Sequence, residues 1–447
     1  MRIVIIGNGI SGITAARFIR KLSEHEITIV SAETEHFFSR TALMYIYMGH
    51  MQYEDTKPYE DWFWEKNRIN LVYDFVKSVN TAQQTLQLSH ATLNYDKLII
   101  ATGSKSNKFG WPGQDLKAVA GLYSYQDLEE MEKYSLDLDR AVIVGGGLIG
   151  IEMAEMFHSR DIPVTMLVRE NNYWDNVLPT EEATMISHHI KEHHIDLRLG
   201  YNLQEIIDDG HGRAAGVVVK ETGERIDCGF VGLTAGVSPN IGFLASSGIE
   251  ADKGVKVNKY METSAPNVYA IGDCAERIEP VPGRRSIEAV WYTGRMMGET
   301  VAYNVCGKRL PYKPGIWFNS AKFLDIEYQV YGTVLNKPAD NHLSLYWQHR
   351  NGKHSVRIIY DKESLAVIGF NLLGIRYRQE ICEQWIKSQT HIEQVLQDLP
   401  LANFDPELCN AYEADILAQY NKSMGKQITL KKKRGLSGVL QYLSRQA

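Results

Sequence analysis

Short runs of aliphatic and β-branched residues alternate with glycine-rich turns and helix-compatible stretches along much of the chain. The runs at residues 2–6 (RIVII) and 141–144 (AVIV) lead directly into glycine turns at residues 7–12 (GNGISG) and 145–150 (GGGLIG). A short apolar run that is bounded by turn residues is typical of a strand buried on both faces of a parallel sheet. The pattern therefore predicts two strand–turn–helix units, one at each glycine turn.

Both turns have the G-x-G-x-x-G spacing of a dinucleotide-binding fingerprint. The first glycine permits a tight turn, the second lets the backbone approach a pyrophosphate, and the third lets the helix pack closely on the strand. Two fingerprints suggest two dinucleotides that face each other, which is the arrangement that a flavin needs to receive hydride from a nicotinamide. The candidate glycines are Gly7, Gly9 and Gly12 in the first turn and Gly145, Gly147 and Gly150 in the second.

Polar residues also follow other predicted strands. Glu33 comes shortly after the strand at residues 27–30, where an acceptor for a ribose hydroxyl is expected; a solvated loop carboxylate is the alternative. Later strands end in Thr102-Gly103, in the turn at residues 234–240 and in Gly272-Asp273. These strand ends predict further walls of a dinucleotide site.

The chain changes character from about Leu310, where tryptophan and tyrosine become frequent. Strand-like stretches such as residues 355–360 appear there as well. We therefore expect a separate C-terminal α+β domain.

Composition excludes several classes of function. The net charge of −6 over 447 residues gives no electrostatic support for a nucleic-acid partner. No apolar run reaches the ~18 residues that a membrane span needs, and a strand that begins at Arg2 leaves no room for an export signal. Dispersed cysteines without metal-type spacing are typical of reduced thiols, so we expect a cytoplasmic protein. The five are Cys228, Cys274, Cys306, Cys382 and Cys409.

Taken together, the two glycine turns, residues 101–103, 234–240 and 270–273 resemble the FAD-dependent pyridine nucleotide–disulfide oxidoreductase superfamily over roughly residues 1–305. The resemblance implies an α/β fold with two Rossmann-like three-layer (ββα) dinucleotide-binding domains and a C-terminal α+β domain. It implies FAD as cofactor and NADH or NADPH as co-substrate. The expected domains are an FAD-binding domain at 1–112 and 238–305, an NAD(P)H-binding domain at 113–237, and the α+β domain at 306–447.

The resemblance also implies roles for single residues. Glu33 looks like the ligand of the FAD adenosine ribose, and Asp273 like the ligand of the flavin ribityl chain. Trp291 is similar to the tryptophan that begins the flavin-contacting helix; a core tryptophan is the alternative. Glu152 is similar to the glutamate that flanks the nicotinamide. The full set is Gly7, Gly9, Gly12, Glu33, Arg40, Thr102, Gly103, Asp273 and Trp291 for FAD, and Gly145, Gly147, Gly150, Glu152, Arg169 and Gly236 for NAD(P)H.

One departure from the superfamily concerns its redox cysteines. Residues 36–45 contain no cysteine, and Arg40 stands where some members carry a single one. A thiolate is the species that attacks a disulfide, so we do not expect disulfide chemistry on the flavin. Ser39-Arg40 instead resembles the Y-x-R-P-x-L-S-K segment of rubredoxin and ferredoxin reductases and of the FAD part of assimilatory nitrite reductase, with Tyr45 in place of the lysine. Arg40 could donate to the FAD diphosphate or to a carboxylate, or form a surface salt bridge.

The resemblance implies that NAD(P)H reduces FAD and that reduced flavin passes electrons to a small iron protein such as rubredoxin or ferredoxin. Flavin does the chemistry, so no catalytic side chain is assigned. There are two alternatives. One is a reductase of the type II NADH:quinone kind, and the other is an FAD-containing redox-sensing protein of the apoptosis-inducing-factor kind. The sequence also admits a homodimer.

The coenzyme is expected to be selected at the end of the strand at residues 164–167. Val168 offers no acceptor to a ribose hydroxyl, whereas Arg169 could bind a 2′-phosphate, which favours NADPH. The neighbouring Glu170 could accept the ribose hydroxyl instead, so NADH stays open.

Two further patterns have simpler interpretations. His189 and His193 lie on one helical face, but no third ligand is evident, so we interpret them as a solvated face and predict no metal site. The basic run at residues 431–434 precedes apolar residues at helical spacing and suggests contact with an anionic membrane surface or an acidic electron carrier. A C-terminal helix that packs on its own domain or on a subunit partner is the alternative.

Overall fold

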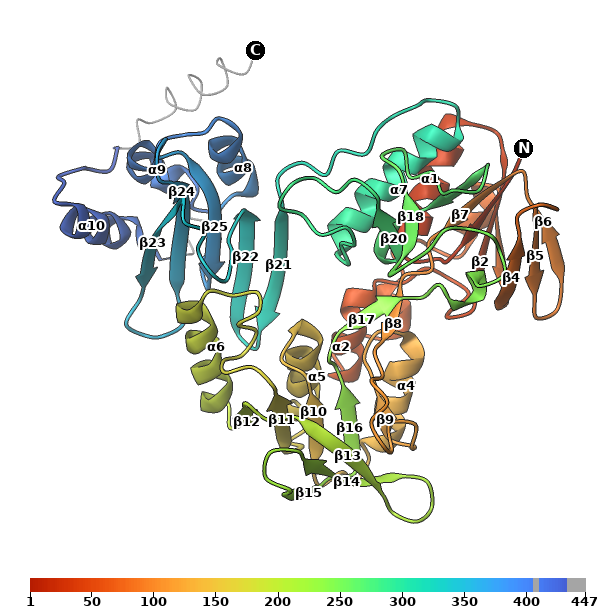
Figure 1. The fold of residues 1–447 in the computed structure, drawn as a ribbon, viewed down its shortest axis with the longest axis horizontal. Helices are drawn as coiled ribbons and strands as arrows, with labels where there is room; N and C mark the ends of the chain where they lie inside the picture. Colours follow the sequence, from red (N-terminus) through yellow and green to blue (C-terminus); the bar gives the residue numbers. More distant parts are fainter. Residues whose placement is uncertain (405–409, 432–447) are drawn as a thin grey trace. The chain divides into compact units, whose positions relative to one another are not determined.

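The computed structural model describes residues 1–404 and 410–431, which form two compact units (Figure 1). The first unit comprises Met1–Asn171 and Ile195–Pro314, and the second comprises Asn172–His194 and the chain from Gly315 onward. The predicted tail helix lies outside the described residues. The boundaries of the three expected domains stay a prediction.

The first half of the first unit is built on a parallel sheet in the order β19-β7-β1-β2-β3. Residues 3–6 of the central strand are buried, as expected for a parallel strand covered on both faces. Helices α1 and α7 pack against each other, and the meander β4-β5-β6 shares the same hydrophobic core. The bounds are β1 Arg2–Ile6, β2 Glu26–Ser31, β3 Ile69–Tyr73, β4 Val76–Asn80, β5 Thr85–Leu88, β6 Thr92–Asn94, β7 Lys97–Ile100, β19 Val268–Ala270, α1 Ile10–Leu22 and α7 Trp291–Val305.

The second half of this unit repeats the plan. Its parallel sheet has the order β12-β11-β10-β16-β9, and a second meander, β13-β14-β15, shares its core. In each sheet the glycine turn leaves the central strand, β1 or β10, and enters a helix, α1 or α5. The bounds are β9 Val119–Ala120, β10 Ala141–Val144, β11 Val164–Val168, β12 Asp196–Leu199, β13 Leu203–Asp208, β14 Ala214–Val219, β15 Arg225–Asp227, β16 Phe230–Leu233, α4 Tyr125–Tyr134 and α5 Leu148–His158.

Smaller elements connect the two halves. The chain crosses between them at β8 (Ser104–Ser106) and β17 (Val237–Pro239), which pair antiparallel. Thr102 donates its hydroxyl to the carbonyl of Asn240 at 2.8 Å, so the strand ends at 101–103 and 234–240 meet. The remaining elements of this unit include α2 Leu43–Tyr47, α3 Trp62–Lys66, β18 Val255–Val257 and β20 Ala275–Arg277.

The second unit is α+β, as the sequence predicts. A five-stranded antiparallel sheet in the order β21-β22-β25-β24-β23 forms one core with helices α8, α9 and α10. The bounds are β21 Phe318–Phe323, β22 Ile326–Gly332, β23 His342–Gln348, β24 Ser355–Asp361, β25 Val367–Leu373, α8 Gln379–Lys387, α9 Ile392–Asp398 and α10 Glu413–Met424.

Helix α6 (Thr180–Glu192) precedes a strand of the nucleotide-binding half in sequence but belongs to the second unit. Arg357 of β24 holds the buried carboxylate of Glu182 with two hydrogen bonds of 2.7 and 2.8 Å. Near the other end of this helix, His189 is only 1 % exposed. The interpretation of a solvated helix face is therefore wrong for His189, because Asp325 covers its ring nitrogen from the turn after β21.

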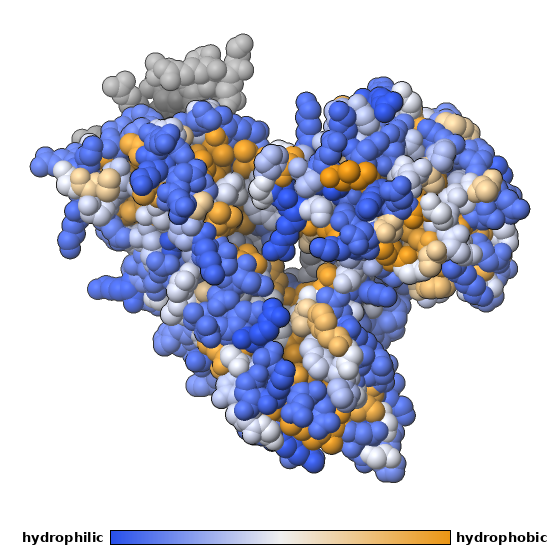
Figure 2. Space-filling view, viewed as in Figure 1, coloured by the Kyte–Doolittle hydropathy of each residue, from blue (hydrophilic) through white to orange (hydrophobic). Residues whose placement is uncertain are grey.

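On the face drawn in Figure 2, hydrophilic residues dominate the surface of each unit, with apolar residues dispersed among them. Among residues 1–404 and 410–431, no helix has the length and apolar character that a membrane span requires.

Candidate functional site

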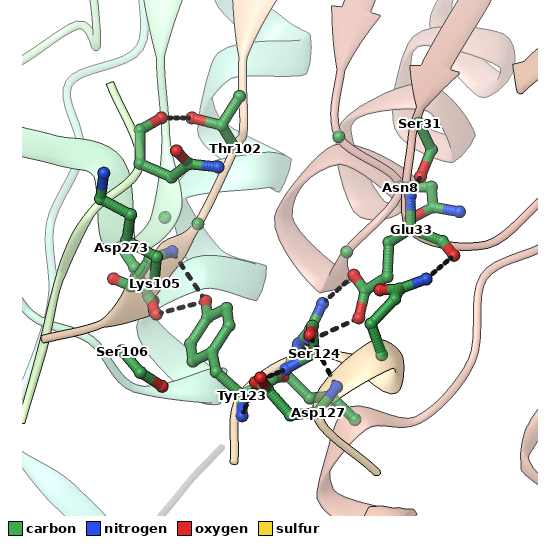
Figure 3. Close-up of a pocket in the computed structure, with 18 of the residues that line it drawn as sticks. Asn8, Ser31, Glu33, Thr102, Lys105, Ser106, Tyr123, Ser124, Asp127 and Asp273 are labelled. Atoms are coloured by element: carbon green, nitrogen blue, oxygen red, sulfur yellow. Dashed lines mark hydrogen bonds and ion pairs between the residues drawn. The ribbon is translucent and has the colours of Figure 1, made fainter. Parts of the chain in front are cut away.

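A cavity of about 1360 Å³ lies in the first unit (Figure 3). Its walls come from the first glycine turn, the end of β2, the segment before α2, the end of β7, residues 119–127, the first turn of α5 and the start of α7. The cavity brings together nine residues predicted from sequence: Gly7, Gly9, Glu33, Arg40, Thr102, Gly103, Glu152, Asp273 and Trp291. The predicted residues Gly12, Gly145, Gly147, Gly150, Arg169 and Gly236 are not part of its wall.

The first glycine turn is shaped to receive a phosphate group. A Cβ on Gly7, whose φ is +109°, would lie 2.2 Å from the carbonyl oxygen of Ala101, and a Cβ on Gly12 would lie 2.1 Å from that of Gly7. Gly9 differs, because a Cβ there would meet nothing within 4 Å. Gly9 is also the N-cap of α1 and supplies no side-chain cap, and the first residues of the helix, Ile10 and Ser11, line the cavity with it. This cradle fits the pyrophosphate of a dinucleotide.

The second glycine turn repeats this geometry. A Cβ on Gly145, whose φ is +130°, would lie 2.6 Å from the carbonyl oxygen of Thr234, and one on Gly150 would lie 2.7 Å from that of Gly145. Gly147, the N-cap of α5, has nothing within 4 Å of its Cβ position. The turn therefore offers a second cradle of the same kind.

Glu33 and Arg40 form a bidentate ion pair at the cavity wall, with hydrogen bonds of 2.7 and 2.5 Å. The backbone amide of Tyr125 donates to the same carboxylate at 2.9 Å, and Arg40 also donates to the carbonyl of Tyr123. Burial lowers the pKa of Arg40, but the hydrogen bonds and charge of Glu33 outweigh that effect and raise it above its usual value. Of the partners expected for Arg40, the structure shows a carboxylate.

Asp273 lies across the cavity and accepts a hydrogen bond of 3.0 Å from the hydroxyl of Tyr123 (Figure 3). That hydroxyl in turn accepts one of 2.9 Å from the amide of Ser104. Burial raises the pKa of Asp273, although Tyr123 and Arg40 oppose the shift. A half-buried carboxylate in the cavity wall, with spare acceptor capacity, fits a ligand that donates hydroxyl hydrogen bonds.

Tyr123 is a residue of this site that the sequence analysis missed. Its ring lies 4.7 Å from the Arg40 guanidinium, so it connects the ion pair to Asp273. Burial raises the pKa of its hydroxyl well above the usual value, so that hydroxyl stays protonated and donates. The chain has 24 tyrosines, and none of the motifs includes this one.

Glu152 and Trp291 border the cavity from two different elements. Glu152 lies in the first turns of α5, and Trp291 begins α7 as the sequence predicts. The side of the cavity near Glu152 is therefore formed by the helix that follows the second glycine turn. Trp291 is 36 % exposed, so the alternative of a core tryptophan is wrong.

The two residues proposed to select the coenzyme pair with each other. Arg169 donates to Glu170 Oε1 at 3.0 and 2.9 Å, and its side chain is 74 % exposed. Val168 is buried against Gly146, whose Cβ would lie 2.7 Å from its Cγ1. Choice between NADH and NADPH stays a prediction.

Thiols are absent from the described wall of the cavity. Cys228, Cys274 and Cys382 are buried elsewhere, and burial raises the pKa of Cys228 to about 12 and the pKa values of the other two as well. These groups are therefore thiols rather than nucleophilic thiolates at neutral pH. Cys409 lies outside the described residues. Tyr45, which replaces the expected lysine, stacks on His50 and is not part of the cavity wall.

Comparisons with known proteins agree with this geometry. The chain is 27 % identical over 394 residues to an assimilatory nitrate reductase electron transfer subunit of Bacillus subtilis, covering 87 % of this chain and 49 % of that protein. It is 26 % identical to an NADH-rubredoxin oxidoreductase of Clostridium acetobutylicum, covering 85 % and 94 %. An NAD-dependent persulfide reductase from A. fulgidus has the same fold, with a TM-score of 0.82, 22 % identity, and coverage of 95 % and 84 %.

The chain thus spans about half the length of the first of these relatives. The family model for pyridine nucleotide-disulphide oxidoreductases matches residues 1–294. This match confirms the predicted family. The predicted fold class and the predicted use of FAD and NAD(P)H are confirmed as well. The chain belongs to the pyridine nucleotide-disulphide oxidoreductase family.

Proposed function

We propose that the chain is an FAD-dependent NAD(P)H oxidoreductase that passes electrons to a small iron protein such as rubredoxin or ferredoxin, without a redox disulfide. One observation carries the proposal. A single cavity joins the first glycine turn, Glu33 and Asp273 to Glu152 of α5, and no cysteine lies in its described wall. FAD bound there supplies hydride acceptance from NAD(P)H and electron release to the acceptor.

In this proposal, residues of the chain bind and orient the two dinucleotides. The open space at Gly9 would receive the FAD pyrophosphate, and that at Gly147 would receive the pyrophosphate of NAD(P)H. Glu33, which Arg40 holds in place, would accept a hydrogen bond from the adenosine ribose, and Asp273 would accept from the ribityl chain. Thr102 and Gly103 line the cavity at the end of β7, and Gly236 directly precedes β17, the strand that pairs with β8.

Trp291 and Glu152 border the side where the two dinucleotides meet. Trp291 is partly exposed, so its ring can also face an incoming acceptor. Backbone amides at the start of α7 would stabilise negative charge on a reduced flavin bound beside them. No acid or base is needed among the side chains.

The acceptor is proposed from chemistry together with the relatives. The described cavity wall contains no cysteine that could relay electrons. One relative, whose alignment covers 85 % of this chain, is named as an NADH-rubredoxin oxidoreductase. No observation favours a quinone reductase or a redox-sensing protein. The four described cysteines are free thiols, which also supports the proposal of a cytoplasmic location.

An anaerobic stopped-flow acceptor screen tests the function. FAD-loaded protein is reduced with one equivalent of NADH or NADPH and mixed with rubredoxin, a [2Fe–2S] ferredoxin, a soluble quinone or an aromatic disulfide. We expect the iron proteins to reoxidise the flavin at least 10-fold faster than the other two. Faster reoxidation by the quinone or the disulfide contradicts the proposal, and slow turnover with all four indicates the redox-sensing alternative.

A further inference from the structure

A cluster of potential metal ligands lies in the second unit, remote in sequence from the residues of the cavity. His189 and His193 at the end of α6 and Asp325 between β21 and β22 place three ligand atoms within 4.8 Å of one another. The sequence predicts no metal site here, because it shows no third ligand. The fold supplies it from 136 residues farther along the chain.

The donor atoms converge on one point. Asp325 Oδ1 contacts His189 Nε2 directly and lies 3.6 Å from His193 Nε2. In a tetrahedral site with bonds of 2.0–2.1 Å, neighbouring donors lie about 3.3 Å apart. The carboxylate of Asp325 is 52 % exposed, so a small rotation of this side chain makes room for an ion between the three donors.

The outer contacts of both histidines suit ligation through Nε2. His193 Nδ1 lies 3.0 Å from the carbonyl oxygen of His189, to which only a protonated Nδ1 can donate. His189 Nδ1 is buried and faces the carboxylate of Glu192 at 3.6 Å. Metal-bound histidines commonly donate their second nitrogen to a carbonyl or a carboxylate. His193 makes such a contact here, whereas His189 Nδ1 has the Glu192 carboxylate nearby but no hydrogen bond.

Lys353 is the competing cation. Its ammonium lies 2.8 Å from Asp325 Oδ2, the carboxylate oxygen that does not face the histidines. The lysine therefore reduces the charge available to an ion without blocking Oδ1. Substitution of Lys353 therefore distinguishes a metal site from a cluster held together by ion pairs alone. Loss of the ammonium should raise the metal affinity of a metal site, whereas it should weaken an ion-pair cluster.

We propose that His189, His193 and Asp325 bind a divalent cation of the zinc class, which links the end of α6 to the turn between β21 and β22. Two imidazoles and one carboxylate are ligands that zinc accepts, and three protein ligands leave a position for water. His193 and Asp325 are partly exposed, so the ion can enter from solvent.

The test uses the whole 447-residue chain, loaded with FAD, after treatment with a chelator. Co²⁺ is titrated while its visible d–d bands are recorded at wavelengths beyond the flavin absorption, and Zn²⁺ then displaces it. His193→Ala and Asp325→Asn are the ligand variants, and His188→Ala, on the same helix with a side chain that is 74 % exposed, is the matched control. FAD content and the melting temperature in metal-free buffer show that each variant folds.

We expect one Co²⁺ per chain, an affinity at least 10-fold lower in His193→Ala and Asp325→Asn, and an unchanged affinity in His188→Ala. Lys353→Met is expected to bind more tightly than wild type. Equal binding by wild type and the two ligand variants overturns the proposal, as does a loss in His188→Ala as large as theirs. Weaker binding by Lys353→Met also overturns it, since the cluster would then depend on the ammonium rather than on an ion.

Discussion

At the residue scale, charged side chains of the first unit are held in pairs. Glu33 meets Arg40 at the cavity, and Arg169 meets Glu170 at the end of β11. An exposed pair contributes little to stability, so the pair at β11 leaves both side chains available for the coenzyme-selecting role that is predicted for them.

The first prediction concerns coenzyme selection. Arg169→Ala should raise the KM for NADPH and spare NADH, because a charge-assisted hydrogen bond to a 2′-phosphate contributes roughly 1.5–3 kcal/mol, or about 10- to 150-fold in binding. Glu170→Ala should act in the opposite sense, since it frees Arg169 for the phosphate and removes the alternative ribose acceptor. Steady-state kinetics with both coenzymes measure the two effects. A wild type that prefers NADH, with Arg169→Ala changing neither KM, would identify Glu170 as the selector instead.

The second prediction concerns Asp273. Burial raises its pKa in the folded protein above the unfolded value of about 3.9. The folded state therefore binds more protons, and the stability of the FAD-free protein falls as the pH rises from about 4 through the raised pKa.

Asp273→Asn removes this ionisation. The FAD-free variant should gain stability relative to wild type as the pH rises, while its FAD affinity should fall about 10-fold or more because a charged acceptor is lost. Thermal unfolding across a pH series and FAD titration at neutral pH measure the two quantities. A variant that loses FAD-free stability at neutral pH would show that the ionised carboxylate stabilises the fold.

At the element scale, each strand–turn–helix unit was predictable because its signals are local. Strand burial, glycine spacing and the start of α7 at Trp291 all depend on neighbours in sequence. Contacts across the chain were not predictable. Tyr123 contacts Asp273, which lies 150 residues away in sequence, and Asp325 contacts His189, which lies 136 residues away. Nothing in the sequence around Tyr123 or Asp325 indicates which distant residue it will contact.

The third prediction separates the glycines of one turn. Gly9→Ala should leave the fold intact but weaken FAD binding, because its Cβ meets no protein atom and projects into the open space of the cradle. Gly12→Ala should destabilise the fold by about 1–3 kcal/mol, because its Cβ would overlap the carbonyl of Gly7. Gly147→Ala is the matched variant in the second turn and should raise the KM for NAD(P)H while FAD is retained.

FAD content, chemical unfolding of the FAD-free protein and coenzyme kinetics distinguish the three variants. Destabilisation by Gly9→Ala as large as that by Gly12→Ala would mean that both glycines serve the turn alone. Loss of FAD from Gly147→Ala would mean that the second turn does not bind the nicotinamide coenzyme.

At the scale of the whole molecule, the two units have separate hydrophobic cores and different chemistry. The first unit contains the cavity, and the second contains the histidine–aspartate cluster. None of the described cysteines reaches the cavity wall. If FAD binds in this cavity as proposed, no described thiol lies in the wall beside it to take up its electrons.

The last prediction concerns the number of electrons that the protein accepts from NAD(P)H. One equivalent of NAD(P)H should fully reduce the bound FAD under anaerobic conditions, because the chain stores two electrons on the flavin and none on a disulfide. The thiol count of the denatured protein should be five before and after reduction, equal to the cysteines of the sequence. A variant with all five cysteines replaced by alanine should be reduced within a few fold of the wild-type rate, provided that its FAD content shows it to be folded. A requirement for two equivalents, with two new thiols appearing on reduction, would reveal a disulfide that includes Cys409 or joins two chains. The protein would then carry out disulfide chemistry, contrary to the proposal.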